Sequence, residues 1–517
     1  MAGILLGIDF GTGGAKACLM SDQGEVLAYA YREYEILVPV AGWSEHDPEN
    51  YWSVTCQLIS EILDRAGVPS SNISGVGLSC ALPSMVLVDE SGNPVAPALN
   101  LMDRRALEEV EHTRSLLGDS LIENLTANRI EDHPSIVNLL WFRNHKPDVF
   151  AATHKALTID GFIAARLTST FAVNRSAAVF YGVAFDIRSG EFRHDVLERV
   201  GIPPTLIPNV CDCVDVIGAV TTAAAAETGL APGTPLVGGQ VDCNAGWIAG
   251  GAIEAGDMQL NLGTCGVLGV VHQSEDYLSH PDGLQMVNIP YTTSPGDTFS
   301  AVAVTTTGGQ TLRYLRDTFG GIELETERLT GISAYELLTS QARDITPGSD
   351  GLIVMPYFMG ERSPLWDASA RGVVFGLSLH HTRGHVLRAF MEGVAYALYY
   401  SFSTLMKTGL PVRHPLVFNE GGAQSAVWRR IITDVLGVPT ARLEGVGGAP
   451  LGDAILAGVG VGVLADFGVA REWARHLDHC EPIAENHERY MEYFAVYRGL
   501  YDDVEKRFRD LHRLVGG

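Results

Sequence analysis

A glycine-rich turn that occurs twice is the feature that most constrains how this chain can fold. Asp9-Phe10-Gly11-Thr12 lies between two apolar runs, Ile4 to Ile8 and Ala17 to Met20, a pattern that predicts the tip of a β-hairpin. The pattern returns as Asn261-Leu262-Gly263-Thr264, again between an alternating run and an apolar run. Two hairpins of one pattern predict two similar halves, with one hairpin in each.

The side chains of the first hairpin suit a phosphate group and a metal ion. Gly11 has no Cβ, so backbone N–H groups can converge on an oxyanion. Thr12 adds a hydroxyl, Lys16 a positive charge, and Asp9 a carboxylate able to hold a hydrated divalent cation. An ordinary tight turn is the alternative, because such turns are common. The second copy favours a pair of hairpins that hold the phosphates of a nucleotide.

An acid follows a glycine pair near the middle of the chain. The apolar strand at Leu236 runs into Gly238 and Gly239, and Asp242 comes just before a helix-like run from Ala245 to Ile253. An acid at this position lies at the carboxyl end of a strand and at a helix start, facing a cleft of an α/β sheet. A helix N-cap without a catalytic role is the alternative.

A further glycine pair follows another predicted strand. Leu416 to Asn419 is apolar, Gly421 and Gly422 come next, and Ser425 precedes a helical pattern. Bare backbone at such a turn lets an adenine or a ribose lie close to it, and Ser425 could bond the edge of either. The turn lacks the GxGxxG spacing, which disfavours a Rossmann dinucleotide site.

The charge balance limits the partners. The chain has 36 basic and 61 acidic residues, a net charge of −25, so neither a nucleic acid nor an anionic membrane is expected as a partner. We find no signal-peptide pattern, and the longest apolar run, Ala454 to Leu464, is too short to cross a bilayer. Eight scattered cysteines without a CxxC pair indicate reduced thiols. A soluble cytoplasmic protein is expected.

Combined with two further segments, these turns resemble a known family. The loop Gly360-Glu361-Arg362-Ser363-Pro364-Leu365-Trp366-Asp367 and the run from Gly372 to Glu392 are similar to motifs of the FGGY carbohydrate kinases. The resemblance runs from Gly7 to about Leu464. Members of this family transfer the γ-phosphate of ATP to a hydroxyl of a sugar or polyol.

The resemblance implies an α/β fold of two actin-like domains, of the ribonuclease H-like (ASKHA) type, with a central nucleotide and sugar cleft. An N-terminal domain over residues 1–253 would bind the sugar and carry the catalytic aspartate. A C-terminal domain over 254–470 would bind the nucleotide. Residues 471–517 would form a helical extension, whose aromatic stripe either packs on the body or forms a homodimer contact.

Site residues are implied by the same resemblance. Asp242 matches the general base, and Asp9, with Asp242, would hold Mg²⁺ on the phosphates of ATP. Asp103 and Arg105 lie in a segment similar to a WxDxR motif that binds the sugar. The residues expected to bind the nucleotide and its phosphates are Gly11, Thr12, Lys16, Gly263, Thr264, Gly308, Gly309, Gly421, Gly422 and Ser425.

The sequence departs from the family pattern in three segments. Leu82 and Pro83 stand where xylulokinases carry a Met-His pair that contacts the sugar, and proline has no ring nitrogen to replace the histidine. Asn138 stands at a position where lysine is usual, and Asp453 at one where alanine is usual. The first departure puts xylulose itself in question as the substrate.

The sequence therefore predicts an ATP-dependent kinase for a small sugar, with pentuloses such as D-xylulose first. Polyols (erythritol, xylitol, glycerol), other ketoses and sugar acids remain alternatives. A catalytically silent, sugar-sensing binding protein on the same fold is an alternative of another class. A purely structural, filament-forming protein of the same fold is less favoured, because Asp103 and Arg105 would then have no purpose.

Overall fold

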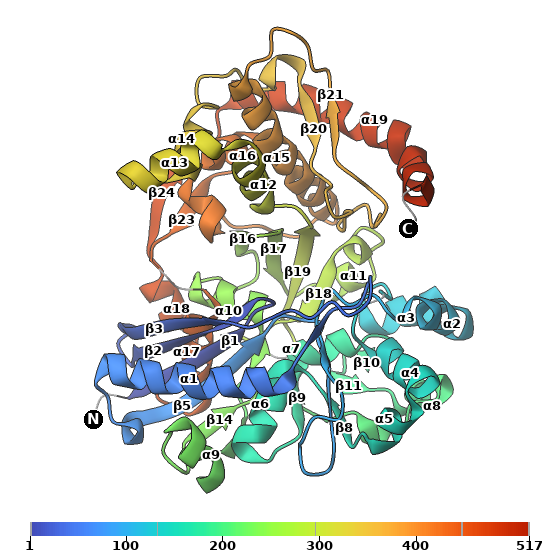
Figure 1. Cartoon of the computed structure of the whole chain (residues 1–517), viewed down its shortest axis with the longest axis vertical. Helices are drawn as coiled ribbons and strands as arrows, with labels where there is room; N and C mark the ends of the chain where they lie inside the picture. Colours follow the sequence, from blue (N-terminus) through green and yellow to red (C-terminus); the bar gives the residue numbers. More distant parts are fainter. Residues whose placement is uncertain (1–2, 132, 295, 446–447, 515–517) are drawn as a thin grey trace. The chain divides into compact units, whose positions relative to one another are not determined.

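The computed structural model describes residues 3–131, 133–294, 296–445 and 448–514. The chain forms two compact units (Figure 1). Unit 1 comprises Met1–Glu254, Asn288–Ser300 and Gly445–Ala474, and unit 2 comprises Ala255–Val287, Ala301–Glu444 and Arg475–Gly517. Each unit has its own mixed β-sheet covered by helices. The predicted two-domain α/β architecture is confirmed.

The sheet of unit 1 has the strand order β13-β14-β5-β1-β2-β3, and β15 also pairs with β5. Strand β1 is antiparallel to β2 and parallel to β5, which is in turn parallel to β15. The turn between β1 and β2 is the predicted first hairpin. The bounds are β1 (Ile4–Phe10), β2 (Gly14–Ser21), β3 (Val26–Glu33), β5 (Ile73–Cys80), β13 (Val216–Ala219), β14 (Pro235–Val237) and β15 (Gln240–Val241).

The sheet of unit 2 repeats this pattern. This sheet, which also includes β18 (Val287–Pro290), has the order β18-β19-β17-β16-β22-β23-β24, with β16 antiparallel to β17 and parallel to β22. Asn261 lies beside Asn419 across β16 and β22, as Asp9 lies beside Ser79 across β1 and β5. The predicted second hairpin is therefore confirmed. The bounds are β16 (Met258–Leu262), β17 (Gly266–His272), β19 (Phe299–Thr305), β22 (Leu416–Asn419), β23 (Thr440–Leu443) and β24 (His476–Cys480).

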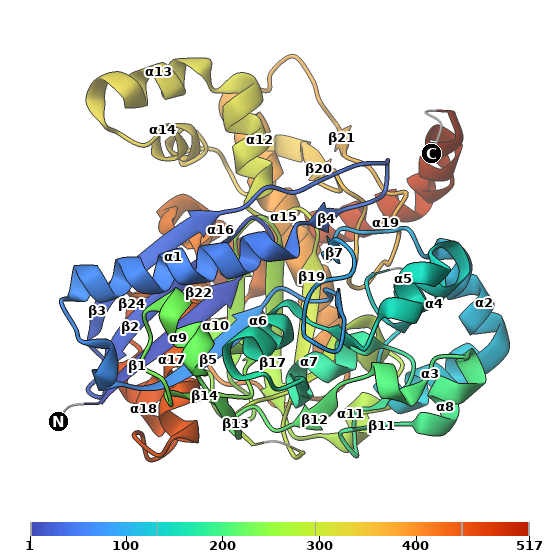
Figure 2. The same ribbon diagram turned by 60° about the horizontal axis from the view of Figure 1, so that its bottom comes forward.

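Two helices cover opposite faces of the first sheet. Helix α1 (Pro48–Ala66), capped by Asp47, contacts β2 and β3 and buries Tyr51, Leu58 and Ile62 (Figure 2). Alternate residues of β1 point to this apolar core, and the intervening ones face α17 (Ala449–Gly460). Helix α10 (Asp242–Ala249) packs beside α17.

Helix α17 approaches the sheet closely because glycines face it. A Cβ at Gly7 would lie 1.9 Å from the Pro450 oxygen, and one at Gly77 would lie 2.2 Å from the Asp453 oxygen. This packing places residues 445–474 in unit 1, where the predicted boundaries put them in the C-terminal domain. The boundary predicted after residue 253 lies one residue before the observed division at Glu254.

The C-terminal helix belongs to unit 2. In α19 (Ala484–Leu514) the aromatic stripe is turned inward: Tyr490 and Tyr497 are buried, and the Tyr497 hydroxyl donates to the Tyr357 hydroxyl at 2.7 Å. Of the two roles predicted for the stripe, packing on the body is the one observed. The predicted separate extension over 471–517 is not a separate part in the structure.

Remaining elements of unit 1 surround the sheet or connect its strands. The helices are α2 (Leu107–Leu117), α3 (Asp119–Thr126), α4 (Ile136–His145), α5 (Pro147–Ala152), α6 (Ile159–Thr168), α7 (Arg175–Ala178), α8 (His194–Val200), α9 (Thr222–Thr228) and α18 (Gly468–Trp473). The short strands are β4 (Glu45–His46), β6 (Val86–Val88), β7 (Ala98–Leu99), β8 (Lys155–Leu157), β9 (Ala172–Asn174), β10 (Phe185–Asp186), β11 (Glu191–Phe192) and β12 (Asn209–Cys211).

In unit 2 the other helices are α11 (Glu275–Leu278), α12 (Gln310–Phe319), α13 (Gly321–Thr330), α14 (Ala334–Ser340), α15 (Arg383–Lys407) and α16 (Ala426–Leu436). The other strands of the chain are β20 (Ile353–Met355) and β21 (Val373–Phe375). Among helices of the described ranges, none combines the length and the apolar character needed to cross a bilayer.

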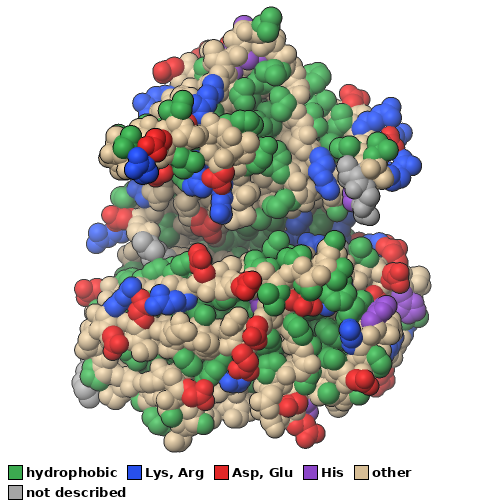
Figure 3. All heavy atoms as spheres, in the orientation of Figure 1, with side chains coloured by type: hydrophobic (Ala, Val, Ile, Leu, Met, Phe, Trp, Pro, Cys, Tyr) green, Lys and Arg blue, Asp and Glu red, His purple; other side chains and the backbone are tan. Residues whose placement is uncertain are grey.

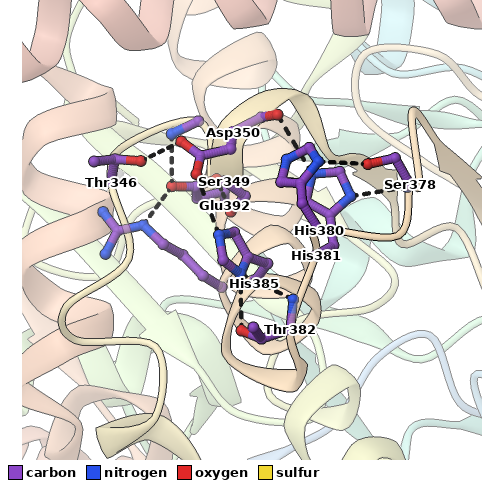
Figure 4. A network of polar contacts seen from close by, with 11 residues as sticks. Thr346, Ser349, Asp350, Ser378, His380, His381, Thr382, His385 and Glu392 are labelled. Atoms are coloured by element: carbon purple, nitrogen blue, oxygen red, sulfur yellow. Dashed lines mark hydrogen bonds and ion pairs between the residues drawn. The ribbon is translucent and has the colours of Figure 1, made fainter.

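The run from Gly372 to Glu392 makes structural contacts within unit 2. Glu392 of α15 accepts hydrogen bonds from Gly348 N at 3.0 Å and from the Ser349 hydroxyl at 2.8 Å. His385, one turn into the same helix, lies 3.2 Å from the Asp350 carboxylate (Figure 4). These contacts fasten the turn at residues 346–350 to the start of α15.

Candidate active site

Three neighbouring strands of unit 1 end at one edge of the sheet. Asp9 of β1 lies beside Ser79 of β5, and Ser79 lies beside Gln240 of β15, all in parallel register. Asp242 follows two residues after Gln240, as the first residue of α10. Adjacent strands lie about 4.8 Å apart. Asp9 and Asp242 are therefore brought to the carboxyl edge of one sheet, where α/β folds place their ligands.

Asp9 sits in a mixed environment. It is 3% exposed, its Oδ2 lies 3.6 Å from Lys16 Nζ, and its Oδ1 lies 3.2 Å from the Ser79 hydroxyl. Burial raises the pKa of Asp9, and the charge of Lys16 and the Ser79 hydrogen bond work in the opposite direction. The acid and the cation that the sequence places in the first hairpin therefore lie beside each other.

An aromatic cluster of Tyr34, His46 and Tyr51 supports the turn of this hairpin. Gly11 N donates to Gly14 O at 3.0 Å, and the Tyr34 hydroxyl donates to Gly11 O. The Tyr34 ring meets the rings of His46 and Tyr51 edge to face, each at a centroid distance of 5.1 Å. Sequence reasoning missed this support. The available signal was the aromatic character of Tyr34, His46 and Tyr51, which precede or lie within α1.

Asp242 is partly buried at the N-terminal end of α10. Its Oδ1 accepts a hydrogen bond from Cys243 N at 2.7 Å. The positive end of a helix dipole stabilises a carboxylate at this position. The predicted order of strand, glycine pair, acid and helix is what the structure shows at residues 235–249.

Asp103 and Arg105 form a buried ion pair. Arg105 Nε lies 2.9 Å from Asp103 Oδ1 and Arg105 Nη2 lies 2.7 Å from Oδ2, which also accepts from Ser44 N at 2.8 Å. The guanidinium lies 4.0 Å from the Trp43 ring centre and bonds Glu45. Both Asp103 oxygens accept hydrogen bonds within unit 1, and Arg105 fixes the orientation of this carboxylate.

Two of the departures from the family pattern have visible structural consequences. Asn138 caps α4, since its Oδ1 accepts from Ser135 N at 3.2 Å. Leu82 is half-buried and Pro83 is buried, directly after the carboxyl end of β5. Pro83 offers neither a donor nor a charge at this edge. The third departure, Asp453, lies buried behind Asp9.

Unit 2 contains a pocket with a volume of about 630 Å³. A pocket of this size fits a nucleoside. It combines the second hairpin with the two other glycine turns. On the face drawn in Figure 3, acidic and basic side chains are scattered among hydrophobic ones in both units. Of the predicted nucleotide-binding residues, those that line it are Gly263, Thr264, Gly309, Gly421, Gly422 and Ser425.

Glycines allow the turns that line this pocket to pack closely against one another. Gly309 N donates to Gly263 O at 2.6 Å, and a Cβ at Gly309 would lie 2.3 Å from that oxygen. A Cβ at Gly422 would lie 2.5 Å from the Leu262 Cγ. Gly308 does not line the pocket, and its N–H donates to Thr264 O at 2.9 Å. Larger residues at 309 and 422 would push the turns apart.

Ser425 begins helix α16. Its hydroxyl accepts from Trp428 N at 3.3 Å, so the side chain caps the helix whose first turn lines the pocket. Asn261 and Asn419 lie at the base of the second hairpin, and their Oδ1 atoms are buried without a hydrogen-bond partner within the described ranges. Buried acceptors of this kind call for a donor from water or a ligand.

A buried acid also supports the second glycine turn. Glu361 accepts from the Thr305 hydroxyl at 2.6 Å and from Thr306 N at 2.9 Å, in the segment that leads to Gly308 and Gly309. Burial raises the pKa of Glu361 to about 7. The sequence motif that contains Glu361 thus fixes a wall of the pocket.

The donor sets fit Mg²⁺ and ATP. Mg²⁺ in phosphoryl-transfer sites is bound by one or two carboxylates together with the substrate's phosphates. Asp9 and Asp242 can supply these carboxylates. Nowhere in the described part of the chain do three or more His, Cys, Asp or Glu side chains gather in a way that could hold a metal ion by themselves.

Comparison with known proteins agrees with this arrangement. The profile described as "FGGY family of carbohydrate kinases, N-terminal domain" matches residues 4–249, and that of the C-terminal domain matches residues 258–461. A xylulose kinase of Bacillus subtilis is 27% identical over 498 residues, covering 96% of each chain. A gluconokinase of the same species is 26% identical over 521 residues, covering 99% of this chain and 98% of the relative.

A solved structure of xylulose kinase from Rhodospirillum rubrum superimposes with a TM-score of 0.86 at 29% identity, covering 98% of this chain and 100% of that one. The two matched domains, the duplicated sheet and the acidic edge define a sugar phosphotransferase. The chain belongs to the FGGY family of carbohydrate kinases.

Proposed function

We propose that this enzyme phosphorylates a small sugar with ATP, most simply a pentulose such as D-xylulose, with Asp242 as the general base. The register that brings Asp9, Ser79 and Gln240 side by side supports this assignment most directly. It puts the candidate base and the candidate metal ligand on the same sheet edge of unit 1.

In this proposal the attacking sugar hydroxyl gives its proton to Asp242 as its oxygen bonds to the γ-phosphorus, and the bond to the β-phosphate oxygen breaks to release ADP. Thr12 and Lys16 of unit 1 and Thr264 of unit 2 neutralise phosphate oxygens. Positioning and charge stabilisation supply most of the rate in such transfers. Arg105, held by Asp103, orders the sugar side of unit 1.

Asp9, with Asp242, would hold Mg²⁺, which supplies positive charge to the phosphates when it is bound. The pocket of unit 2 would take the adenosine of ATP, with Gly421, Gly422 and Ser425 beside it. Reduced cysteines, all eight of which are free, support a cytoplasmic location for the enzyme.

The substrate assignment rests on similarity. Xylulose kinases are prominent among the relatives, and a gluconokinase matches at nearly the same identity. Leu82 and Pro83 cannot copy a Met-His contact to xylulose. Polyols, other ketoses and sugar acids are therefore the second group of candidates, and a silent sugar-binding protein is the alternative outside enzymes.

The deciding experiment is ADP release from Mg-ATP with a panel of pentuloses, polyols, ketohexoses and sugar acids. We expect one sugar to stimulate the wild type, and Asp242→Asn to lower its turnover by about 100-fold or more. Asp195→Asn is the matched control, because Asp195 is also an acid in the first turn of a short helix of unit 1, where it accepts hydrogen bonds from the exposed side chain of Arg193.

Asp195→Asn should keep the wild-type rate. Full turnover in Asp242→Asn would reject the assignment of the base. A panel in which no sugar stimulates ADP release, with ATP still bound, would favour the binding protein.

A further inference from the structure

Asp453 is an unusual residue for the place it occupies. It lies inside α17 among small and apolar residues and is completely buried. Its two oxygens meet only neutral groups in the described structure: the Ser79 hydroxyl at 2.6 Å and the Gln240 side-chain nitrogen at 3.1 Å. An unpaired buried carboxylate is costly, so a carboxyl group at this position calls for a reason.

The orientation of Gln240 tells the two Asp453 oxygens apart. The Thr292 hydroxyl donates to Gln240 Oε1 at 2.8 Å, so the amide NH₂ of Gln240 is the end that faces Asp453. Amide orientation is assigned from such networks. Asp453 Oδ1 is therefore an acceptor, and Oδ2 is the oxygen that faces Ser79.

The Ser79 hydroxyl lies between two carboxyl groups and has one hydrogen to give. Its oxygen is 2.6 Å from Asp453 Oδ2 and 3.2 Å from Asp9 Oδ1. If Ser79 donates to one of them, the other must donate to Ser79. Asp9 has Lys16 beside it and is the better place for a negative charge.

Two further facts favour a neutral acid at 453. Burial raises the pKa of Asp453 well above its usual value, and the charge of Asp9 raises it further. A proton on Asp453 Oδ2 lets that oxygen donate to Ser79, and Ser79 then donates to Asp9. In this arrangement one continuous series of hydrogen bonds runs from Gln240 through Asp453 and Ser79 to Asp9.

We propose that Asp453 is a positioning residue: it turns the Ser79 hydroxyl toward Asp9 and, through Gln240, ties Asp9 to the strand that leads to Asp242. The close approach of α17 at Gly77 is what brings Asp453 within reach of Ser79. The inference rests on the proposed role of Asp9 in holding the metal ion.

The test measures metal binding rather than turnover alone. Mn²⁺ replaces Mg²⁺, and the free Mn²⁺ signal in electron paramagnetic resonance is followed at saturating ATP. We expect Asp453→Ala and Ser79→Ala to weaken Mn²⁺ binding by about tenfold or more, because residues that orient a metal ligand commonly contribute this much. The double variant should be no weaker than either single variant, since both act through one hydrogen bond.

Asp453→Asn distinguishes positioning from simple filling of space. Asparagine can accept from Gln240 with its oxygen and donate to Ser79 with its nitrogen, as the neutral acid does. It should restore Mn²⁺ binding to within about twofold of the wild type. Thermal unfolding of the metal-free proteins should show the same order, with Asp453→Asn close to the wild type.

Asp160→Ala is the matched control. Asp160 is another buried acid of unit 1, held by the Asn174 side chain at 2.9 Å and by the Cys80 thiol at 3.2 Å, and neither of these hydrogen bonds involves Ser79 or Asp9. Its loss should lower stability and leave the Mn²⁺ affinity unchanged.

The proposal is overturned if Asp453→Asn binds Mn²⁺ as poorly as Asp453→Ala, or if Asp160→Ala weakens binding equally. It is supported if the affinities follow the predicted order. If that order holds and no sugar stimulates ADP release, the proposed function fails and the role of Asp453 stands.

Discussion

The two hairpins share one backbone pattern and differ in charge. At the first, Asp9 lies beside Ser79 with Lys16 across the hairpin, and at the second, Asn261 lies beside Asn419. The first hairpin offers an acid and a cation to a reacting group. The second offers neutral amides and opens onto a pocket of about 630 Å³.

A buried acid lies close to each hairpin, Asp453 at the first and Glu361 at the second, and the two acids contact different kinds of group. Asp453 reaches Asp9 through Ser79, and so acts on a charged side chain of the first hairpin. Glu361 holds the Thr305–Thr306 backbone next to the second hairpin. The duplicated fold therefore provides two similar frames. In the proposed function, the side chains placed on them divide the work into chemistry in unit 1 and nucleotide binding in unit 2.

The largest effect is expected where the first hairpin is made to resemble the second. Asp9→Asn should lower turnover by about 100- to 1000-fold, because it removes a charge that acts on the transferring phosphate and its metal ion. Steady-state kinetics against Mg²⁺ concentration measures this loss. Unchanged Mg²⁺ dependence would show that Asp9 is not the metal ligand.

Glu361→Gln sharpens the contrast between the two buried acids. The folded chain holds the Glu361 proton with a pKa of about 7, against 4.5 for an ordinary glutamate, so stability falls as pH rises from about 4.5 to about 7. Glutamine has no such proton. The free energy of unfolding of the variant should therefore lack this pH-dependent loss of about 3 kcal/mol. Urea unfolding of both proteins between pH 4.5 and 8 measures it. Parallel curves would contradict the assignment.

Gly422→Ala tests the close packing of the second hairpin. The added methyl would meet Leu262 and should lower the free energy of unfolding by about 2 kcal/mol, with weaker ATP binding. Gly421→Ala is the control for packing, because a Cβ there meets no protein atom within 4 Å. If both variants unfold alike in urea, the close contact at Gly422 is not important for stability.

Tyr34→Phe is expected to have the smallest effect of the four. It removes the hydrogen bond that the hydroxyl donates to Gly11 O and keeps the ring, so it should cost about 1 kcal/mol of stability. Thermal unfolding shows the cost. No change in either stability or turnover would mean that the aromatic cluster does not support the first hairpin.

Much of the fold could be predicted from short sequence patterns. The repeated Asp9 and Asn261 turns indicated a duplicated hairpin, since a glycine turn between apolar runs has few other solutions. The turn before Asp242 was predicted for the same reason. Residues 445–474 could not be assigned correctly, because their helix packs on β1 through glycines distant in sequence, and close approach leaves no local signal.

The candidate site was predicted less completely. Gly263, Thr264, Gly421 and Gly422 were named from local turns and Gly309 from the family resemblance, and the structure gathers them around one pocket. The link from Asp453 through Ser79 to Asp9 joins three distant segments, so no spacing in the sequence reveals it.

Reciprocal exchange of the two hairpin residues tests the division of work most directly. The measurement is calorimetry of metal-free ATP binding to Asp9→Asn and to Asn261→Asp. We expect Asp9→Asn to bind ATP within about threefold of the wild type, and Asn261→Asp to bind about tenfold more weakly, because it sets a negative charge beside the phosphates. Strong loss in Asp9→Asn with full binding in Asn261→Asp would contradict the account.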